Sequence, residues 1–272
     1  LPEIKPIMEI DALVRRFKQV CDRWEEPRAV KMINTVRTDF TELYKHPDLL
    51  SARTKLDSSA KRIATSDDTL DNHRRMFVLF CDLMHATPEV MEMEERDQVT
   101  LARKSFLPFY LLMTALWSRR SNKPGICFTN GSYFPTSKEH QPLPDVNECA
   151  SRCVFYLNEP IRALDLTEAE QAVIAYLTCF YDGLPQLSPE GCKLHYAMRE
   201  KLLRYLKDVC RRTMRTREIP SEFAEVIRVS RIISLFPSIT DLSIRASDNL
   251  EACEMLQIVK FDSFMGRMER IV

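Results

Sequence analysis

Glycine is scarce in this sequence, with 5 residues among 272. Phosphate-binding loops and turn-dense β folds both need glycine, because it adopts backbone conformations that other residues rarely reach. The sequence contains neither a P-loop nor a dinucleotide-binding fingerprint. The scarcity of glycine therefore excludes the common phosphate-binding motifs and argues against an all-β fold.

A net charge is also lacking, since 39 basic residues balance 39 acidic ones. Domains that bind nucleic acid through its phosphates normally carry a clear basic excess. The chain starts at Leu1 rather than at methionine, which favours a fragment of a longer protein. We therefore expect any contact with DNA to be made by an upstream domain that is missing here.

Long apolar runs, secretory signals and paired cysteine motifs are absent as well. Crossing a bilayer takes about 20 apolar residues, and no run approaches that length, so we expect no membrane contact. The nine cysteines are scattered, and Cys149 and Cys153 suit one helix face better than a zinc site because no second pair completes it. This usage predicts reduced, packed thiols in a cytosolic or nuclear protein, and no metal site.

Catalytic signatures are missing too. There is no His-Glu-x-x-His and no Gly-x-Ser-x-Gly sequence, and the acidic residues between Glu89 and Asp97 fit a solvated helix junction. The five histidines are separated from one another and from the cysteines, which favours surface or satisfied positions: His46, His73, His85, His140 and His195. We predict that the chain is not an enzyme.

The stretch from Met76 to Arg120 is the most informative part of the sequence. An amphipathic segment ends near Met84 to Ala86, a short acidic stretch follows, and a second helix opens at Asp97-Gln98. This second helix is almost wholly apolar from Phe106 to Trp117, a pattern typical of a helix that is buried on all sides. We therefore predict a central core helix.

Helical periodicity continues on both sides of this stretch. A first helical pattern runs from Ile10 to Trp24, with Asp11 as a cap and a break at residues 25–27. Further predicted helices cover 29–44, 146–157, 168–180 behind a Thr167-x-x-Glu170 capping box, 190–215, and 222–259 with a break at Pro237. Residues 51–72 are polar and predict a mobile loop with room for one helical piece, whereas Asn130-Gly131 between apolar residues predicts a hairpin. The helix at 190–215 has a strongly basic side, which fits either a solvated face or a surface for an anionic partner.

Spaced residues after the first helix of the Met76–Arg120 stretch form a pattern. They are Pro88, Val90, Met93, Asp97, Gln98, Leu101 and Arg103. This pattern resembles the signature of nuclear receptor ligand-binding domains, in which a proline follows the third helix, spaced apolar residues come next, and an Asp-Gln pair leads into a Leu-rich helix that ends in a basic residue. The resemblance reaches from about Thr69 to the C-terminus, and more loosely to the N-terminus.

The resemblance implies an all-α fold: a three-layer antiparallel helical sandwich of about ten to twelve helices with one small β-hairpin. It implies one ligand-binding domain over residues 1–272. Its parts would be N-terminal helices at 6–50, the loop at 51–72, a core at 73–259 and a terminal activation-like helix at 260–272. The zinc-finger DNA-binding domain of such a receptor would lie upstream.

The resemblance also implies an apolar pocket and no cofactor. Its ligand would be a fatty acid or a sterol-like lipid. Trp117 stands where acid-binding members place an arginine, and Arg119 lies two residues away on another helix face, so the carboxylate contact of those members lacks its partner. The residues expected to line the pocket are His73, Met76, Phe77, Phe80, Phe106, Tyr110, Met113, Thr114, Trp117 and Phe128.

A further implied feature is a surface groove for a Leu-x-x-Leu-Leu helix or a corepressor helix. The family holds the two ends of that helix with a lysine and a glutamate, but here His85 and Arg267 occupy those positions. Sliding the alignment by two residues would place Glu269 at the second position instead. The expected groove residues are His85, Val99, Arg103, Phe264, Met265, Arg267, Met268 and Glu269.

Two functions remain open on this basis. One is a nuclear transcription factor whose lipid ligand controls coregulator binding. The other is an orphan receptor domain whose pocket is filled by bulky side chains such as Phe77, Phe106 and Tyr110, and which works through dimerisation and corepressors. In either case the family's dimer surface, for a homodimer or a heterodimer, would be the helical region 222–259.

Overall fold

The computed structural model describes residues 4–26, 39–181, 184, 186–217 and 223–258. The helices are α1 (Ile4–Asp22), α2 (Phe40–Lys45), α3 (Ser66–His85), α4 (Pro88–Met91), α5 (Glu95–Ser118), α6 (Cys149–Cys153), α7 (Glu159–Leu164), α8 (Glu168–Phe180), α9 (Pro189–Thr216), α10 (Ala224–Ile233) and α11 (Leu235–Met255). The strands are β1 (Asp57–Ile63), β2 (Gly125–Cys127) and β3 (Asn130–Pro135). Short 3₁₀ turns cover Pro47–Leu49 and Lys138–His140, and a π-helical turn covers Val154–Asn158.

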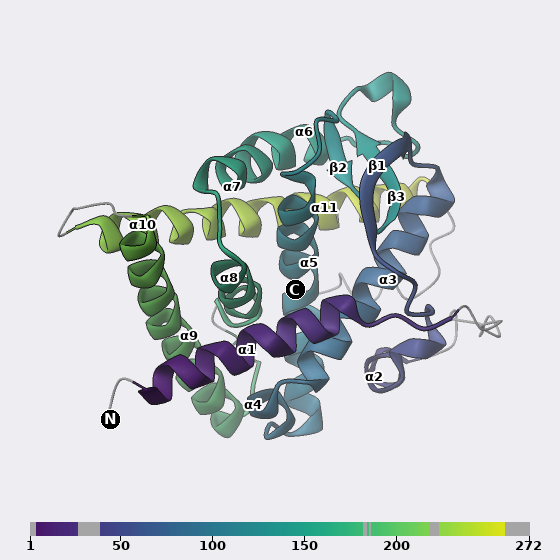
Figure 1. Cartoon of the computed structure of the whole chain (residues 1–272). Helices are drawn as coiled ribbons and strands as arrows, with labels where there is room; N and C mark the ends of the chain where they lie inside the picture. Colours follow the sequence, from purple (N-terminus) through teal and green to yellow (C-terminus); the bar gives the residue numbers. More distant parts are fainter. Residues whose placement is uncertain (1–3, 27–38, 182–183, 185, 218–222, 259–272) are drawn as a thin grey trace.

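The helices are arranged in three layers, as predicted. Figure 1 shows α1 in front of α5 and α8, and α11 behind α5. Within the middle layer α8 packs against both α5 and α9, while α3 joins α1 on one side and α10 joins α11 on the other. The helical sandwich with a small sheet is therefore confirmed.

The central helix α5 is buried along most of its second half, as its composition predicts. Between Phe106 and Ser118 most side chains have little or no exposed surface. Pro108 lies inside the helix without ending it, although proline removes one backbone hydrogen bond there. The buried α5 packs against α3, α8 and α11 and so forms the centre of the domain.

The small sheet contains the predicted hairpin and one strand more. β2 and β3 pair antiparallel, and Gly131 at their turn has φ +79°, a conformation that glycine adopts without strain. β1 lies parallel to β3 at the other edge, so the strand order is β1-β3-β2. A parallel partner from a distant segment leaves no local hairpin signal, which is why the sequence did not predict it.

The predicted loop over residues 51–72 contains a strand that the sequence did not indicate, and its helical piece is the start of α3. Its middle forms β1 and its end opens α3, where Thr65 and Asp68 form a reciprocal capping box. Asp68 also pairs with Arg62 of β1 and accepts a hydrogen bond from Asn130 of β3 at 2.7 Å. A polar segment is thus ordered by side-chain contacts that lie outside its own sequence.

Several predicted helix limits need correction. Asp11 lies inside α1 rather than at its start. The break in the last long helical region falls at Ser234, between α10 and α11, rather than at Pro237. Pro237 lies in the first turn of α11, where a backbone N–H has no partner within the helix, so its missing N–H costs nothing. The helix expected at 146–157 is divided by the π turn, where the amide of Glu159 bonds to the carbonyl of Val154. Of the helix expected at 29–44, residues 27–38 lie outside the described part of the chain.

Candidate functional site

The interface between α3 and α5 brings together most of the residues predicted to line a pocket. The ring of Phe106 lies 5.1 Å from that of His73, 5.2 Å from Phe77 and 5.6 Å from Phe80, measured between centroids. Met76, Phe77 and Phe80 have no exposed surface, and Phe106 has almost none. These side chains form an aromatic cluster that fills the space between the two helices.

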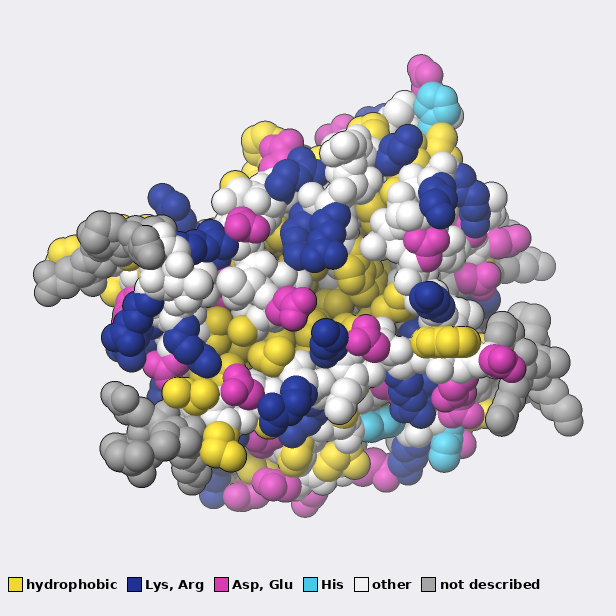
Figure 2. Space-filling view, viewed as in Figure 1, with side chains coloured by type: hydrophobic (Ala, Val, Ile, Leu, Met, Phe, Trp, Pro, Cys, Tyr) yellow, Lys and Arg dark blue, Asp and Glu magenta, His cyan; other side chains and the backbone are white. Residues whose placement is uncertain are grey.

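Other predicted pocket residues lie apart from this cluster. Met113 and Trp117 line a groove of about 200 Å³ beneath α1, together with Phe17 and Leu116. Figure 2 shows apolar side chains in the hollow near the middle of this face, with charged side chains around it. Thr114 is buried and its hydroxyl donates to the carbonyls of its own helix, whereas Phe128 is buried in the sheet turn.

A polar corner closes the aromatic cluster on the side of the hairpin. Asn72 accepts hydrogen bonds from the amide and the hydroxyl of Thr129, at 2.8 and 2.9 Å, and donates to the Tyr110 hydroxyl at 3.0 Å. Asn72 and Thr129 were not predicted as site residues. A lone Asn within an amphipathic helix is a weak signal, and its partner comes from a turn 57 residues away.

His73 lies beside this corner and stays neutral. Its ring is 5.2 Å from that of Tyr110, and its Nε2 atom has no hydrogen-bond partner among the described residues. Burial, together with the positive charge of Arg74, lowers the pKa of His73 to about 3. The corner therefore presents uncharged hydrogen-bonding groups, while Tyr110 keeps some accessible surface.

The predicted groove residues at the end of α3 and on the first turns of α5 are all partly exposed. His85 ends α3 and is half-buried, with Val99 and Arg103 on the first turns of α5. Burial lowers the pKa of His85, so it does not supply the positive charge of a lysine at neutral pH. The other predicted groove residues, Phe264, Met265, Arg267, Met268 and Glu269, lie outside the described residues.

Comparison with known protein families identifies the family of this chain. A family model for the ligand-binding domain of nuclear hormone receptors matches residues 55–256. The chain belongs to this family. The match begins just before β1 and ends just after α11, so it covers most of the described helices.

Relatives of this receptor domain are found in Caenorhabditis elegans. Nuclear hormone receptor family member nhr-61 is 29% identical over 229 residues, which cover 81% of this chain and 54% of the relative. Family member nhr-4 is 26% identical over 238 residues, covering 86% of this chain and 47% of the relative. The chain thus spans about half the length of the curated relatives it matches.

The signature residues of the receptor domain have structural roles. Asp97 is almost fully buried and accepts hydrogen bonds from the backbone amide and hydroxyl of Ser188, the residue that caps α9. Gln98 donates to the carbonyl of Met93 at 2.9 Å and so closes the turn before α5. Pro88 opens α4, while Leu101 lies in the core.

Gly191 gives a test of the Asp97 contact. A Cβ atom at Gly191 would lie 2.1 Å from Asp97 Oδ2. We expect Gly191→Ala to lower the free energy of unfolding by about 1–3 kcal/mol, because the packed carboxylate has to move. Helix propensity alone predicts the opposite sign, a gain of about 1 kcal/mol.

Urea denaturation measures the free energy of unfolding of the parent and of the Gly191→Ala variant. Ala197→Gly, at an exposed position of the same helix, isolates the propensity contribution. A Gly191→Ala variant as stable as the parent, or more stable, would show that Asp97 does not constrain the start of α9.

The basic side of α9 is largely neutralised. Lys201 pairs with Glu89 at 2.9 Å and Arg211 with Glu225 at 2.7 Å, while Arg217 pairs with Asp165 at 2.8 Å. These ion pairs favour the interpretation as a solvated face with internal partners. A surface for an anionic partner would need a cluster of Lys and Arg side chains that are not neutralised by acidic neighbours.

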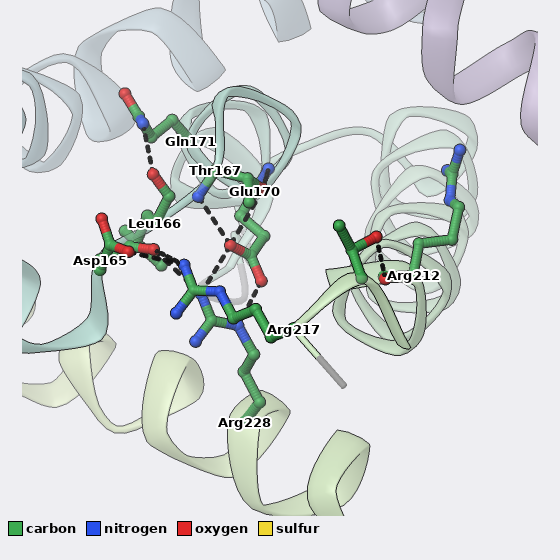
Figure 3. Close-up of polar contacts among 9 residues, drawn as sticks. Asp165, Leu166, Thr167, Glu170, Gln171, Arg212, Arg217 and Arg228 are labelled. Atoms are coloured by element: carbon green, nitrogen blue, oxygen red, sulfur yellow. Dashed lines mark hydrogen bonds and ion pairs between the residues drawn. The ribbon is translucent and has the colours of Figure 1, made fainter. Parts of the chain in front are cut away.

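A buried ion pair ties α8 to α10. Arg228 donates to both carboxylate oxygens of Glu170, and the second hydrogen bond is 2.8 Å long (Figure 3). Burial by itself would raise the pKa of Glu170, but the hydrogen bonds from Arg228 and from the Thr167 amide bring it below its usual value. The predicted capping box of Thr167 and Glu170 is present and takes part in this network.

Two negative findings concern the described part of the chain. No helix there is long and apolar enough to cross a membrane. No group of three His, Cys, Asp or Glu residues there could hold a metal ion.

Proposed function

We propose that this chain is the regulatory domain of a nuclear transcription factor, in which the interior between α3 and α5 controls coregulator binding on their outer surface. The observation that carries the proposal is the sharing of helices. α3 contributes Phe77 and Phe80 to the aromatic cluster and His85 to the outer surface, and α5 contributes Phe106 inside and Arg103 outside. A shift of either helix changes both sites at once.

Such a domain works by shifting populations. A ligand or a partner that prefers one arrangement of the helices makes that arrangement more common, by no more than its difference in affinity for the two states. In this proposal the terminal segment 260–272, which lies outside the described residues, completes the coregulator groove. DNA would be bound by a domain beyond this chain.

The polar corner favours a particular ligand chemistry. A fatty acid or a sterol-like lipid remains the proposed class, but neutral His73, Asn72 and Tyr110 suit an uncharged hydroxyl or carbonyl group better than a carboxylate. Native mass spectrometry of the purified domain tests this. A stoichiometric lipid mass that is lost on denaturation supports a ligand, and a neutral lipid supports the stated class.

A second candidate function rests on the filled interior. The rings of Phe77, Phe80 and Phe106 contact one another, that of Phe109 contacts Phe80, and all four side chains have almost no accessible surface. A receptor domain of this kind needs no ligand and acts through dimers and corepressors. A clean protein mass, with no change of melting temperature across fatty acids and sterols, would favour it.

The proposed dimer surface is the region 222–259. Phe223, Val226 and Ile227 near the start of α10, and Ile244 on α11, are large apolar residues with about half or more of their surface exposed. Val226 and Ile227 lie three and four residues after Phe223, so these three side chains share one face at the start of α10. Exposed apolar patches mark protein interaction sites. Light scattering of the purified domain tests this, with Val226→Glu expected to shift a dimer toward monomer.

The coregulator surface is tested by restoring the family's charges. Replacing His85 by Lys and Arg267 by Glu is expected to strengthen binding of a Leu-x-x-Leu-Leu peptide by about two- to fivefold for each change, because each charge then faces the favourable end of the helix dipole. Fluorescence anisotropy of a labelled peptide measures the effect.

The matched control for this pair is His140→Lys, which adds the same charge on an exposed turn far along the chain. Equal affinities for the parent, the control and the double variant would mean that the groove lies elsewhere.

A further inference from the structure

Helix α2 has the residue pattern of a coregulator helix. Its sequence Phe40-Thr41-Glu42-Leu43-Tyr44 places large apolar residues at the first, fourth and fifth positions, as in Leu-x-x-Leu-Leu. Phe40 and Leu43 are 1% exposed and Tyr44 is 2% exposed, so all three are buried against the rest of the domain. The side chain of Glu42, between them in sequence, points outward with 53% exposed.

These side chains pack on the proposed coregulator surface. The Tyr44 ring lies edge-on to His85, 4.8 Å between centroids, and the guanidinium of Arg103 lies 4.2 Å from the centre of the Phe40 ring. Phe40 also meets Phe77 of α3 at 5.5 Å. α2 therefore lies against both α3 and α5, with Tyr44 at the end of α3 and Phe40 beside Phe77 and Arg103.

Polar contacts with α5 also hold α2 in this position. The Tyr44 hydroxyl donates to Gln98 at 3.5 Å, and Lys45 pairs with Glu95 at 2.7 Å. The residues contacted on α5 thus include Gln98 and Arg103, which flank Val99 of the predicted groove. Figure 1 shows α2 beside α3 on the side away from α9.

The direction of α2 also matches that of a bound coregulator helix. Tyr44, near its C-terminal end, contacts His85, the position at which the charge that receives a peptide's last carbonyls is expected. Phe40, at its N-terminal end, lies toward Arg103. Sequence pattern, burial and direction agree.

We propose that α2 is an internal occupant of the coregulator groove, and that an external Leu-x-x-Leu-Leu helix binds by displacing it. The proposal rests on the proposed function, which makes this surface the coregulator site. A helix of six residues has little stability of its own, so α2 is helical because it is docked and unfolds when it is released. Docking of α2 is then an off state built into the domain.

Hydrogen exchange on the parent protein tests displacement directly. With an excess of Leu-x-x-Leu-Leu peptide, amides of residues 40–45 are expected to exchange at least tenfold faster, while those near His85 and Val99 become protected. Protection near His85 with unchanged exchange in 40–45 would overturn the proposal but leave the coregulator surface in place.

A second experiment needs no coregulator. A labelled peptide with the sequence of residues 37–48 is added to the Leu43→Ala variant, in which the docked helix is weakened. We expect this peptide to bind the variant at least tenfold more tightly than the parent, whose groove is occupied. The matched control is Glu42→Ala, which changes an exposed side chain of the same helix and should behave as the parent.

The two experiments separate the two proposals. Binding of the 37–48 peptide to Leu43→Ala, with no Leu-x-x-Leu-Leu peptide binding to any variant, would support the docked α2 and contradict the coregulator function. Equal binding of the 37–48 peptide to the parent and to a folded Leu43→Ala variant would overturn the docking proposal. If circular dichroism shows that Leu43→Ala is unfolded, hydrogen exchange on the parent decides.

Discussion

Replacing Arg228 by alanine is expected to lower the free energy of unfolding by about 3–5 kcal/mol, the usual cost of removing one partner of a buried ion pair. Glu170 has no exposed surface, and the Arg228 side chain is 8% exposed. Without the guanidinium, the Glu170 carboxylate stays buried, with the Thr167 amide and hydroxyl still donating hydrogen bonds to it but no positive charge beside it in this pair. Thermal and urea unfolding measure the loss.

Two control variants test whether the buried charge of Glu170 causes this loss of stability. Arg245→Ala removes an exposed arginine from a surface pair with Asp241 on α11, and should change stability far less. Glu170→Gln combined with Arg228→Met removes both charges and should recover part of the loss, because no buried charge is then left unpaired. A loss no larger in Arg228→Ala than in Arg245→Ala would contradict the burial argument.

Lowering the pH from 7 to 5 is expected to cost about 2 kcal/mol of unfolding free energy through His73 alone. In the unfolded chain a histidine takes up a proton near pH 6.5, whereas burial lowers the pKa of His73 to about 3 in the folded domain. Between these values the unfolded chain binds the proton and the folded domain does not. Stability is therefore complete above pH 6.5 and falls steadily toward pH 3.

His195 adds an effect of the same sign. It is buried on α9, and burial next to the charge of Arg199 lowers its pKa to about 4. Its contribution also begins as the pH falls below about 6.5, where the unfolded histidine starts to charge. The parent domain should therefore lose stability well before its carboxylates are protonated.

The variant that tests this is His73→Phe, which keeps an aromatic ring against Phe106 and Tyr110. Urea unfolding at pH 7 and pH 5 should show a smaller loss in this variant than in the parent. His140→Phe, at an exposed turn, is the matched control and should keep the parent's pH dependence. An unchanged loss in His73→Phe would mean that His73 titrates normally in the folded state.

Local patterns in the sequence predicted much of the helical framework. The apolar run of α5, the capping box at Thr167 and the turn at Gly131 each depend on residues within a few positions of one another. Such signals are complete within a short window, because helix hydrogen bonds and caps close over three to five residues. The structure changed their limits by a few residues and kept their type.

Only part of the candidate site could be predicted from the sequence. The resemblance to the receptor family implied that His73, Phe77 and Phe106 face a common interior, where the structure brings them together. The same reasoning grouped Met113 and Trp117 with them, although these two face α1 instead. A helix that is apolar all round has no sequence signal for which neighbour each side meets.

By itself, the sequence determined the helical class, the central core helix, the capping box at Thr167 and the hairpin turn at Gly131. Only the tertiary structure decided that β1 pairs with β3, that Asp97 meets Ser188 and that α2 packs on His85. Each of these contacts joins segments far apart along the chain. Their formation depends on the path of everything between them, which no local pattern contains.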